Sequence, residues 1–410
     1  MKIAVMGHGV VGSGVVEVFY QHYENLKRKS GREMDIKYIL DLRDFPESPY
    51  REKFIKDFSL IENDPEVTIV AEVMGGLHPA YDYVRACLEK GKSVVTSNKE
   101  LVAAKGAELL RIAREHNVNF FFEASVGGGI PIIRPLHLCL AANEINEIAG
   151  ILNGTTNFIL TKMIRESMSF EDALKMAQEL GYAERDPSAD VEGQDACRKI
   201  CILASLAFGR HVYPQEVHTE GITKITLEDV AYAGNWGGVI KLIGRARRLE
   251  DGGVSAMVSP GFIHFGSQLA SVDDVFNGIL VRGDATGDVV FYGKGAGKLP
   301  TASAVVADIV DAAKATGSSR SLRWEEGDGH TVCDWKETSS AFYFRLRGGC
   351  SEEALRRLFG PVKMLHRDGQ PQDETAFVTG MLKEKDAAAA AEQLRASGCA
   401  VLGSIRVLDY

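Results

Sequence analysis

The chain has 410 residues, of which 45% are hydrophobic and 25% charged, the composition of an ordinary globular protein. This length leaves room for two or three domains, each large enough to bury its own core. The net charge of −9, with no long basic run, argues against a nucleic-acid partner. No apolar run approaches the ~20 residues that would span a membrane, so a membrane partner is not expected either.

The seven cysteines lack the CxxC and CxH spacings of a zinc site. Cys87, Cys139, Cys197 and Cys201 fall within apolar helical patterns, where a thiol serves as a small hydrophobic group. Such usage is typical of a reducing compartment. The chain begins directly with a predicted strand and shows no signal-peptide pattern, which favours the cytoplasm.

Residues 1 to about 130 alternate between short apolar runs and amphipathic stretches. This alternation predicts an α/β domain in which helices cover both faces of a parallel sheet. The predicted strands are 3–6, 36–40, 67–72, 93–96 and 119–122, and the predicted helices are 10–29, 81–90 and 105–115.

The rest of the chain predicts two further domains. Residues 131–297 have an α+β pattern, with helices at 170–180 and 193–208 before strands that include 254–258 and 289–291. Residues 338–410 predict a separate ferredoxin-like unit of βαββαβ order. Its predicted strands are 341–346, 375–382 and 400–407, its helices are 351–358 and 386–396, and the polar segment 324–338 is the predicted linker.

A glycine-rich turn joins the first predicted strand to the first helix. Its sequence, Gly7-His8-Gly9-Val10-Val11-Gly12, matches the Gly-x-Gly-x-x-Gly fingerprint in the strand–turn–helix context that the fingerprint requires. The glycines allow a tight turn and close backbone approach, while the helix N-terminus offers N–H groups to a pyrophosphate. The first domain is therefore predicted to be a Rossmann-type dinucleotide-binding domain.

The end of the second predicted strand bears on the choice of cofactor. Asp41 could accept the ribose 2′-hydroxyl of NAD, whereas Arg43 could accommodate the 2′-phosphate of NADP. Asp41 lies closer to the strand end, so NAD is favoured, with NADP left open. Both charges could also contact only water.

Asp195 and Lys199 are four residues apart on one edge of a predicted helix. A surface pair of this kind would contribute only about 0.3 kcal/mol. Glu184, Asp186 and Asp190 arrive just upstream, however, and such a mixture of carboxylates and a lysine suits a small zwitterionic substrate. The group thus favours a substrate site over a solvated ion pair.

Several strings occur in a fixed order that resembles the homoserine dehydrogenase family over roughly residues 1–320. They are Thr96-Ser-Asn-Lys-Glu100, Glu123-Ala-Ser-Val-Gly-Gly-Gly-Ile-Pro-Ile132, Asn153-Gly-Thr-Thr-Asn-Phe158, Gly181-Tyr-Ala-Glu-Arg-Asp-Pro187, Asp190-Val-Glu-Gly-Gln-Asp-Ala-Cys-Arg-Lys199, Gly293-Lys-Gly-Ala-Gly297 and Pro300-Thr-Ala-Ser303. The resemblance implies an enzyme that interconverts L-aspartate 4-semialdehyde and L-homoserine with NAD or NADP, in threonine and methionine biosynthesis.

The resemblance also implies roles for individual residues. Lys99, Lys199 and Asp195 would be catalytic, with Lys199 favoured as substrate anchor and Lys99 as proton donor, a division that the sequence leaves open. An ammonium near the carbonyl oxygen would stabilise the negative charge that develops there. The substrate would contact Glu184, Asp190, Gly154, Thr155 and Tyr182, and the cofactor would contact Gly7, Gly9, Val10, Val11, Gly12, Asp41, Arg43, Ser97, Asn98 and Gly297.

Family members bind sodium largely through backbone carbonyls of the segment that begins here at Glu123, with a carboxylate contribution. The matching residues are Glu123, Val126, Gly128 and Ile130. The same glycines could instead only shape a hinge between domains. By the same resemblance, residues of about 298–320 return to the dinucleotide-binding domain through a helix at 302–315, and the chain is a homodimer or homotetramer.

The tail resembles the ACT domain that is attached to many members of this family. Its loop 347–353 lacks the proline of the usual effector-binding turn, and Glu352 and Glu353 add negative charge there. We therefore expect the tail to support assembly, with a weak or absent response to threonine.

Two other functions compete with this one. Aspartate-semialdehyde dehydrogenase chemistry needs a reactive cysteine near a histidine, and no cysteine here lies in such a motif. A regulator that only senses nucleotides would have no need for the acid–lysine group.

Overall fold

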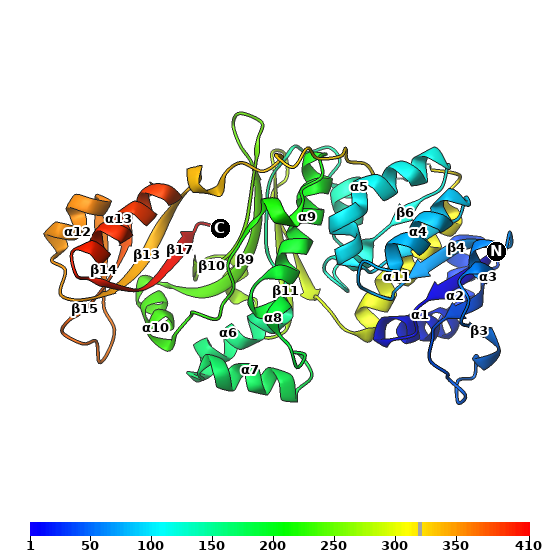
Figure 1. The fold of residues 1–410 in the computed structure, drawn as a ribbon, viewed down its shortest axis with the longest axis horizontal. Coiled ribbons are helices and arrows are strands. Elements are labelled where there is room, and N and C mark those ends of the chain that lie inside the picture. Colours follow the sequence, from blue (N-terminus) through cyan, green and yellow to red (C-terminus); the bar gives the residue numbers. More distant parts are fainter. Residues whose placement is uncertain (319–321) are drawn as a thin grey trace. The chain divides into compact units, whose positions relative to one another are not determined.

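The computed structural model describes residues 1–318 and 322–410, and it divides into two compact units (Figure 1). Unit 1 comprises Met1–Glu144, Cys201–Pro214 and Gly293–Thr331. Unit 2 comprises Ile145–Ile200, Gln215–Tyr292 and Val332–Tyr410. Each unit is described below by itself.

Unit 1 contains a six-stranded, fully parallel sheet in the order β3-β2-β1-β4-β5-β6. The order reverses beside β1, which is the place where dinucleotides bind in doubly wound sheets. All five predicted strands are present to within two residues at each end, and the short β3 was not predicted. The strands are β1 (Lys2–Met6), β2 (Asp35–Leu40), β3 (Phe54–Ile55), β4 (Val67–Glu72), β5 (Ser93–Thr96) and β6 (Phe120–Phe121).

The helices of unit 1 pack as expected against an apolar sheet. Val15 and Phe19 of α1 and Ile309 of α11 share one core with Ile3 and Ile36 of the strands. Three boundaries differ from prediction: the helix predicted at 10–29 breaks at His22, α5 begins six residues early, and α11 begins four residues before the predicted 302. The helices are α1 (Val10–Gln21), α2 (Tyr23–Ser30), α3 (Ser59–Glu62), α4 (Ala80–Glu89), α5 (Lys99–Glu115) and α11 (Lys298–Lys314).

The segment predicted as a linker contains a core residue, so that prediction was wrong at its start. Trp324 is buried, its Nε1 donates to Nδ1 of His211 at 3.0 Å, and its ring meets Phe122 edge-on. A Cβ on Gly106 would lie 2.6 Å from the indole, so α5 accommodates Trp324 only through a glycine. One aromatic side chain anchors this polar segment to unit 1.

Unit 2 is built on an 11-stranded sheet in the order β12-β11-β7-β9-β10-β17-β13-β15-β14. The remaining two strands lie off this path: β8 (His218–Thr219) pairs with β10, and β16 (Leu382–Lys383) pairs with β13. The others are β7 (Ile145–Ile151), β9 (Gly238–Arg248), β10 (Val254–His264), β11 (Phe276–Gly283), β12 (Gly287–Lys294), β13 (Ser339–Arg347), β14 (Val362–Leu365), β15 (Glu374–Thr379) and β17 (Ala400–Leu408).

Seven helices accompany this sheet, and the predicted helices at 170–180 and 193–208 are confirmed within one residue. They are α6 (Gly154–Glu166), α7 (Phe170–Glu179), α8 (Ser188–Val191), α9 (Gln194–Phe208), which begins in unit 2, α10 (Leu227–Trp236), α12 (Glu352–Phe359) and α13 (Glu384–Ala396).

The tail has the predicted βαββαβ order with one addition, the two-residue β16 before α13, and β14 is the strand that its pattern did not locate. It is not a separate unit, because β17 pairs in parallel with β10 through Arg406–Leu408 and joins the tail to the large sheet. The structure also joins Cys350 to Cys399 by a disulfide, contrary to the expectation of thiols throughout. A separation of 49 residues gave no sign of this pairing.

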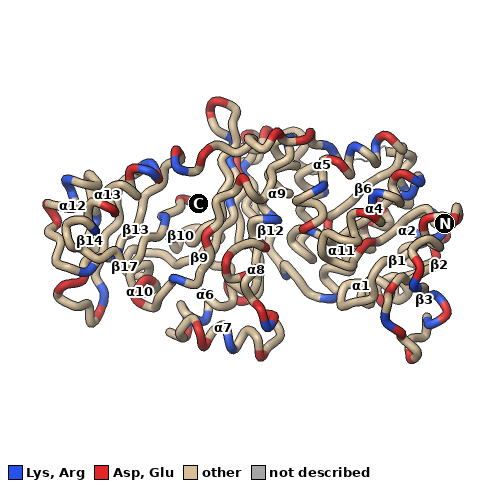
Figure 2. Tube along the Cα trace, viewed as in Figure 1, with Lys and Arg blue, Asp and Glu red and all other residues tan. Residues whose placement is uncertain are grey.

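The four cysteines assigned to apolar patterns are thiols, and Cys139 is exposed rather than buried. No helix within the described residues combines the length and apolarity needed to cross a membrane. Lysine and arginine are interspersed with aspartate and glutamate along both units (Figure 2).

Candidate active site

The glycine-rich turn between β1 and α1 has the geometry that its sequence predicts. Gly7 has a φ of 99°, and a Cβ on Gly12 would lie 2.0 Å from the carbonyl oxygen of Gly7. A Cβ on Gly9 would meet no atom within 4 Å, so this backbone borders open space. Gly9 is the N-cap residue of α1, and it has no side chain to cover the helix N-terminus. Val10 and Val11 form the first turn of the helix, and Val10 is 69% exposed. The first N–H groups of α1 thus suit a pyrophosphate.

Beside this turn lies a cleft of about 420 Å³, lined by the turn itself, by the end of β2, by the segments that follow β2, β3 and β4, and by the start of α4. Asp41 accepts the N–H of His8 at 2.8 Å, and Arg43 Nε and Nη2 approach its two oxygens at 3.0 and 2.8 Å. The guanidinium of Arg43 holds the pKa of Asp41 well below its usual range. An adjoining cavity shares Lys56 with this cleft and adds Arg51, and sequence reasoning missed both residues because they lie beyond the strand end.

The end of β4 carries a carboxylate that sequence reasoning also missed. Glu72 is fully buried, and burial raises the pKa of its carboxyl. It accepts the N–H groups of Met74 and Gly75 at 2.8 and 3.3 Å and the hydroxyl of Thr96 at 2.5 Å. The sequence did contain a signal for this residue, since an acidic residue ends an otherwise apolar predicted strand. Since Met74 lines the cofactor cleft, Glu72 fixes one of its walls.

The Ser97-Asn98-Lys99 string lies at the start of α5 and is tied to the same network. The N–H of Asn98 donates to Thr96 Oγ1 at 2.9 Å, and its side-chain amide donates to the carbonyl of Gly76 at 2.6 Å. Asn98 Oδ1 accepts the N–H of Leu101 and caps the helix, which explains its early start at Lys99. The β4 loop and the base of Lys99 are therefore fixed by one set of hydrogen bonds.

In unit 2 the structure brings together three charged residues predicted for the site. Lys199 Nζ donates to Asp195 Oδ2 at 2.7 Å and to the carbonyl of Leu152 at 2.7 Å. Asn153 donates to Asp195 Oδ2 at 2.9 Å and to Asp190 Oδ1 at 2.7 Å through one amide nitrogen. Asp195 and Lys199 are both more than 90% buried, so this is not a surface ion pair.

Asn153 was not among the predicted site residues, although it opens the string Asn153-Gly-Thr-Thr. Its Oδ1 accepts the N–H of Thr156 at 2.8 Å and caps α6. An asparagine that caps a helix uses its side-chain oxygen, so the sequence does not show which acceptors its amide nitrogen contacts. Only the fold shows that the nitrogen donates to two carboxylates.

The remaining predicted substrate residues occupy the start of α6 and the loop after α7. A Cβ on Gly154 would lie 2.7 Å from the carbonyl of Val275, so this glycine is required for packing. The buried hydroxyl of Thr155 donates to the carbonyl of Tyr182 at 2.6 Å and holds that loop. Tyr182 is 44% exposed, and Glu184 is exposed on the same loop.

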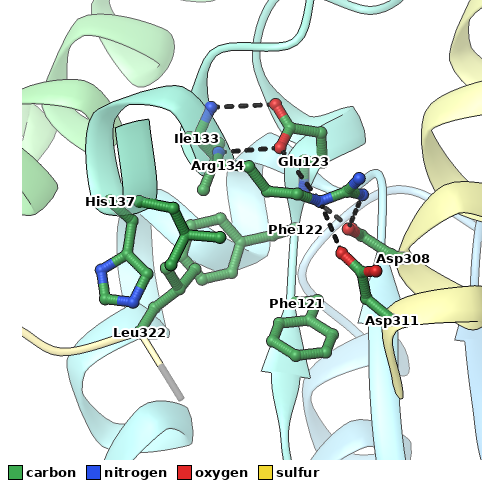
Figure 3. Close-up of a pocket in the computed structure, with 10 residues that line it drawn as sticks. Phe121, Phe122, Glu123, Ile133, Arg134, His137, Asp308, Asp311 and Leu322 are labelled. Carbon is green, nitrogen blue, oxygen red and sulfur yellow. Dashed lines mark hydrogen bonds and ion pairs between the residues drawn. The ribbon is translucent and has the colours of Figure 1, made fainter. Parts of the chain in front are cut away.

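The candidate sodium loop has a carboxylate that is already engaged. Glu123 accepts the backbone N–H groups of Ile133 and Arg134, each at 2.9 Å (Figure 3), and that of Ile132 at 2.6 Å. Arg134 pairs with Asp308 at 2.6 Å and Asp311 at 3.1 Å, and burial raises the pKa of Asp308 to about 7. The predicted carboxylate contribution to a cation is therefore not supported. No group of three or more His, Cys, Asp or Glu residues in the described chain could hold a metal.

The backbone of this loop packs against the Gly293–Gly297 loop of the same unit. The N–H of Gly129 donates to the carbonyl of Lys294 at 3.1 Å, and a Cβ on Gly128 would lie 2.4 Å from the carbonyl of Gly295. Val126 and Ile130 are buried. Gly297, with a φ of 124°, caps α11.

Two family models match the chain. The model of homoserine dehydrogenase matches residues 131–310, and the model of the homoserine dehydrogenase NAD-binding domain matches residues 7–123. The homoserine dehydrogenase of Bacillus subtilis is 43% identical over 317 residues, which cover 76% of this chain and 72% of that protein. That of Pseudomonas aeruginosa is 41% identical over 355 residues, 85% of this chain and 82% of that protein.

Solved structures give the same result. A homoserine dehydrogenase from Thiobacillus denitrificans has a TM-score of 0.89 at 36% identity, covering 100% of this chain and 98% of that one. A hyperthermophilic archaeal homoserine dehydrogenase in complex with NADPH has a TM-score of 0.66 at 29% identity, covering 78% of this chain and 99% of that one.

The Glu72 network gives a testable prediction. The carboxylate of Glu72 accepts three hydrogen bonds. In Glu72→Gln the amide N–H points at one of those three donors, and the lost hydrogen bond costs about 1–2 kcal/mol. We expect kcat/KM for the nicotinamide cofactor to fall about tenfold, mainly through KM, because the wall of the cleft loosens. Steady-state kinetics with Glu66→Gln, an exposed glutamate on the preceding loop, provide the control. Identical constants for the two variants would contradict the role of Glu72.

Proposed function

We propose a division of roles among the active-site residues of this chain, which belongs to the homoserine dehydrogenase family. The chain is an NAD(P)-dependent oxidoreductase that interconverts L-aspartate 4-semialdehyde and L-homoserine. This membership sets aside the two competing functions, a cysteine-dependent semialdehyde dehydrogenase and a regulator without activity. The observation that carries the proposal is the hydrogen-bonded group of Asn153, Asp190, Asp195 and Lys199, in which all but the half-buried Asp190 are buried.

Lys199 serves as the substrate anchor. Two fixed acceptors, Asp195 Oδ2 and the carbonyl of Leu152, hold its ammonium in place at 2.7 Å each. An ammonium that is buried and held in place by hydrogen bonds is preorganised to bind an oxygen of the substrate. Asp190 and Glu184 receive the substrate ammonium, and Asn153 sets the orientation of Asp190.

Lys99 serves as the proton donor. It is the first residue of α5, and the Asn98 cap fixes its backbone at the start of that helix. Bound NAD(P)H supplies the hydride for aldehyde reduction. As the carbonyl oxygen becomes an alkoxide, the lysine ammonium stabilises it and gives up a proton to form the homoserine hydroxyl.

The 2′-position of the cofactor faces mixed charges. Arg43, Arg51 and Lys56 oppose Asp41 and Asp44 in the cavity beside the ribose end of the cleft, giving one cation in excess. Arg43 already neutralises Asp41, which weakens the repulsion that this carboxylate would exert on a 2′-phosphate. The cleft therefore suits both NAD, which the position of Asp41 favours, and NADP.

A sodium ion held by the candidate sodium loop would be bound by the backbone carbonyls of Glu123, Val126, Gly128 and Ile130, since hydrogen bonds to backbone N–H groups already occupy the Glu123 side chain.

The chain is also predicted to associate with copies of itself.

The tail acts as an ACT-like module that supports assembly rather than a threonine sensor. Its four main strands follow the order β17-β13-β15-β14. The N–H groups of Gly348 and Gly349 both donate to the carbonyl of Asp373, at 3.0 and 3.4 Å, so they are not open to an effector carboxylate. Exposed Glu352 and Glu353 add negative charge beside them.

Replacing either lysine tests the proposed chemistry. We expect Lys199→Ala and Lys99→Ala each to lower turnover a hundredfold or more. Loss of the charge at the oxyanion costs on the order of 3 kcal/mol in Lys99→Ala, and loss of the anchor leaves the substrate misplaced in Lys199→Ala. Cofactor binding, measured by quenching of protein fluorescence, should stay near normal in both. Lys175→Ala, at an exposed position of α7, is the matched control and should retain full turnover. Near-normal turnover in both active-site variants would refute this mechanism.

Removing Asp41 tests cofactor selection. Asp41→Ala leaves Arg43 without its partner and removes a negative charge, so the NADPH-to-NADH ratio of kcat/KM should rise about tenfold. Arg43→Ala should lower the same ratio. If the ratio is unchanged in Asp41→Ala, Asp41 does not lie at the ribose.

Added threonine tests the tail. We expect millimolar L-threonine to change the rate of homoserine oxidation by less than about twofold, a coupling well under 1 kcal/mol. L-serine at the same concentration controls for general amino-acid effects. Strong inhibition by threonine alone would show that the loop 347–353 does bind an effector.

A further inference from the structure

One buried asparagine of β11, Asn277, lacks a hydrogen-bond partner among the described residues of the chain. Its side chain is in the interior, with a residue exposure of 1%, and neither the amide oxygen nor the amide nitrogen meets a donor or an acceptor. A buried polar group without a partner destabilises the folded state, and most buried amides in proteins are therefore hydrogen-bonded. An amide that the fold does not use points to a ligand.

The register of the sheet in unit 2 shows which way Asn277 points. The β7–β11 ladder ends with Gly278 opposite Ile151, so Asn277 comes opposite Leu152, the next residue along. Successive residues of a strand point to opposite faces, and directly opposed residues share a face. A Cβ on Gly278 would meet Val272 Cγ2 at 2.9 Å, so the segment that contains Val272 covers the other face. Asn277 and Leu152 therefore both point away from that segment.

The face that Asn277 shares with Leu152 is the face that α9 covers. A Cβ on Gly244 of β9 would lie 2.9 Å from Leu152 Cδ1 and 3.3 Å from Ile200 Cβ, so the sheet packs against the helix there. The same helix carries Lys199, whose Nζ donates to the carbonyl of Leu152 at 2.7 Å. Asn277 therefore stands across the sheet from the residue that holds the substrate anchor. It is about as buried as that lysine, which is 7% exposed.

Two buried side chains hold the backbone that leads into Asn277. Asn157 Nδ2 donates to the carbonyls of Val272 and Phe276 at 3.0 and 3.2 Å. Lys241 Nζ donates to the same Val272 carbonyl at 2.5 Å, from a fully buried position on β9. This segment is therefore fixed on both sides, and it presents the Asn277 amide in a defined position, as a preorganised binding group requires.

The Lys199 ammonium cannot satisfy a substrate carboxylate by itself. An ammonium has three N–H donors, and Asp195 and the carbonyl of Leu152 take two of those of Lys199, which leaves at most one for the substrate. A carboxylate has two oxygens, which accept about four hydrogen bonds. The side-chain amide of Asn277 has two N–H donors, and because it is neutral it adds no further charge to this buried region.

We propose that Asn277 is a further substrate-binding residue, whose side-chain N–H groups donate to the carboxylate of homoserine beside the Lys199 ammonium. This inference rests on the anchoring role proposed for Lys199 above. Asp190 and Glu184 receive the substrate ammonium and Lys99 acts at the hydroxyl oxygen, so the carboxylate is the polar group that still needs donors. Asn277 thereby helps the enzyme to select an α-amino acid over an amino alcohol that has no carboxylate.

Asn277→Leu separates a role in binding from a role in folding. Leucine has nearly the shape of asparagine but no hydrogen-bonding group, so this variant removes a polar group without a partner from the core. We expect the Tm to stay the same or to rise, while the KM for L-homoserine rises about tenfold and kcat and the KM for the nicotinamide cofactor stay near normal. Asn235→Leu, the same substitution at an exposed position of α10, is the matched control. A lower Tm or an unchanged KM for homoserine in Asn277→Leu would overturn the proposal.

Two competitive inhibitors of homoserine oxidation identify the group that Asn277 binds. L-α-aminobutyrate keeps the ammonium and the carboxylate of homoserine and lacks the hydroxyl, whereas propanolamine keeps the ammonium and the hydroxyl and lacks the carboxylate. Asn277→Leu should raise the inhibition constant of aminobutyrate about tenfold and leave that of propanolamine unchanged. Equal effects of the substitution on both inhibition constants would contradict the assignment to the carboxylate.

The lysine variant described above distinguishes failure of this inference from failure of the proposed function. Near-normal turnover in Lys199→Ala would remove the anchor on which the inference rests, whatever the Asn277 variant does. Loss of turnover in Lys199→Ala together with unchanged constants in Asn277→Leu would instead refute the role of Asn277 alone and leave the proposed function intact.

Discussion

The side-chain amide of Asn153 is the contact on which the substrate region of unit 2 depends. Its oxygen caps α6, and its nitrogen donates to Asp190 and Asp195, so one planar group fixes a helix start and two carboxylates. Lys199 then completes a buried pair with Asp195. A charged pair at this depth is favourable only when its remaining hydrogen-bonding capacity is met, and Asn153 and the Leu152 carbonyl meet it. The chemistry proposed for Lys199 follows from that fixed position.

In unit 1, Glu72 fixes the positions of the neighbouring site residues, as Asn153 does in unit 2. A carboxylate at the end of β4 gathers two backbone N–H groups and the hydroxyl of Thr96, and through Asn98 it fixes the start of α5. Each unit thus places one uncharged amide next to a buried carboxylate, Asn98 beside Glu72 and Asn153 beside Asp195. The residues that orient the two sites, Glu72 and Asn153, were not among the predicted functional residues. The residues that they orient, such as Asn98 and Asp190, were predicted.

The sequence predicted most of what depends on local pattern. The strands of unit 1 end where apolar runs end, and the glycine turn was recognisable because its spacing and its place between strand and helix are both local. Contacts between distant segments were not predictable. The Trp324 anchor, the Cys350–Cys399 bond and the pairing of β17 with β10 join segments whose partners no spacing reveals. The role of Asn153 was not predictable for the same reason, since a capping pattern in the sequence does not show which other groups the side-chain amide contacts.

Asp195 and Lys199 act as one functional unit, because each holds the other in a fixed position. A double-mutant cycle in kcat/KM for homoserine, built from Asp195→Asn, Lys199→Met and the two together, tests it most directly. If the pair is one unit, the first substitution already removes its function, and the double variant is no slower than the slower single variant. Losses that multiply, so that the double variant is slower than either single variant by the full factor of the other, would contradict this account.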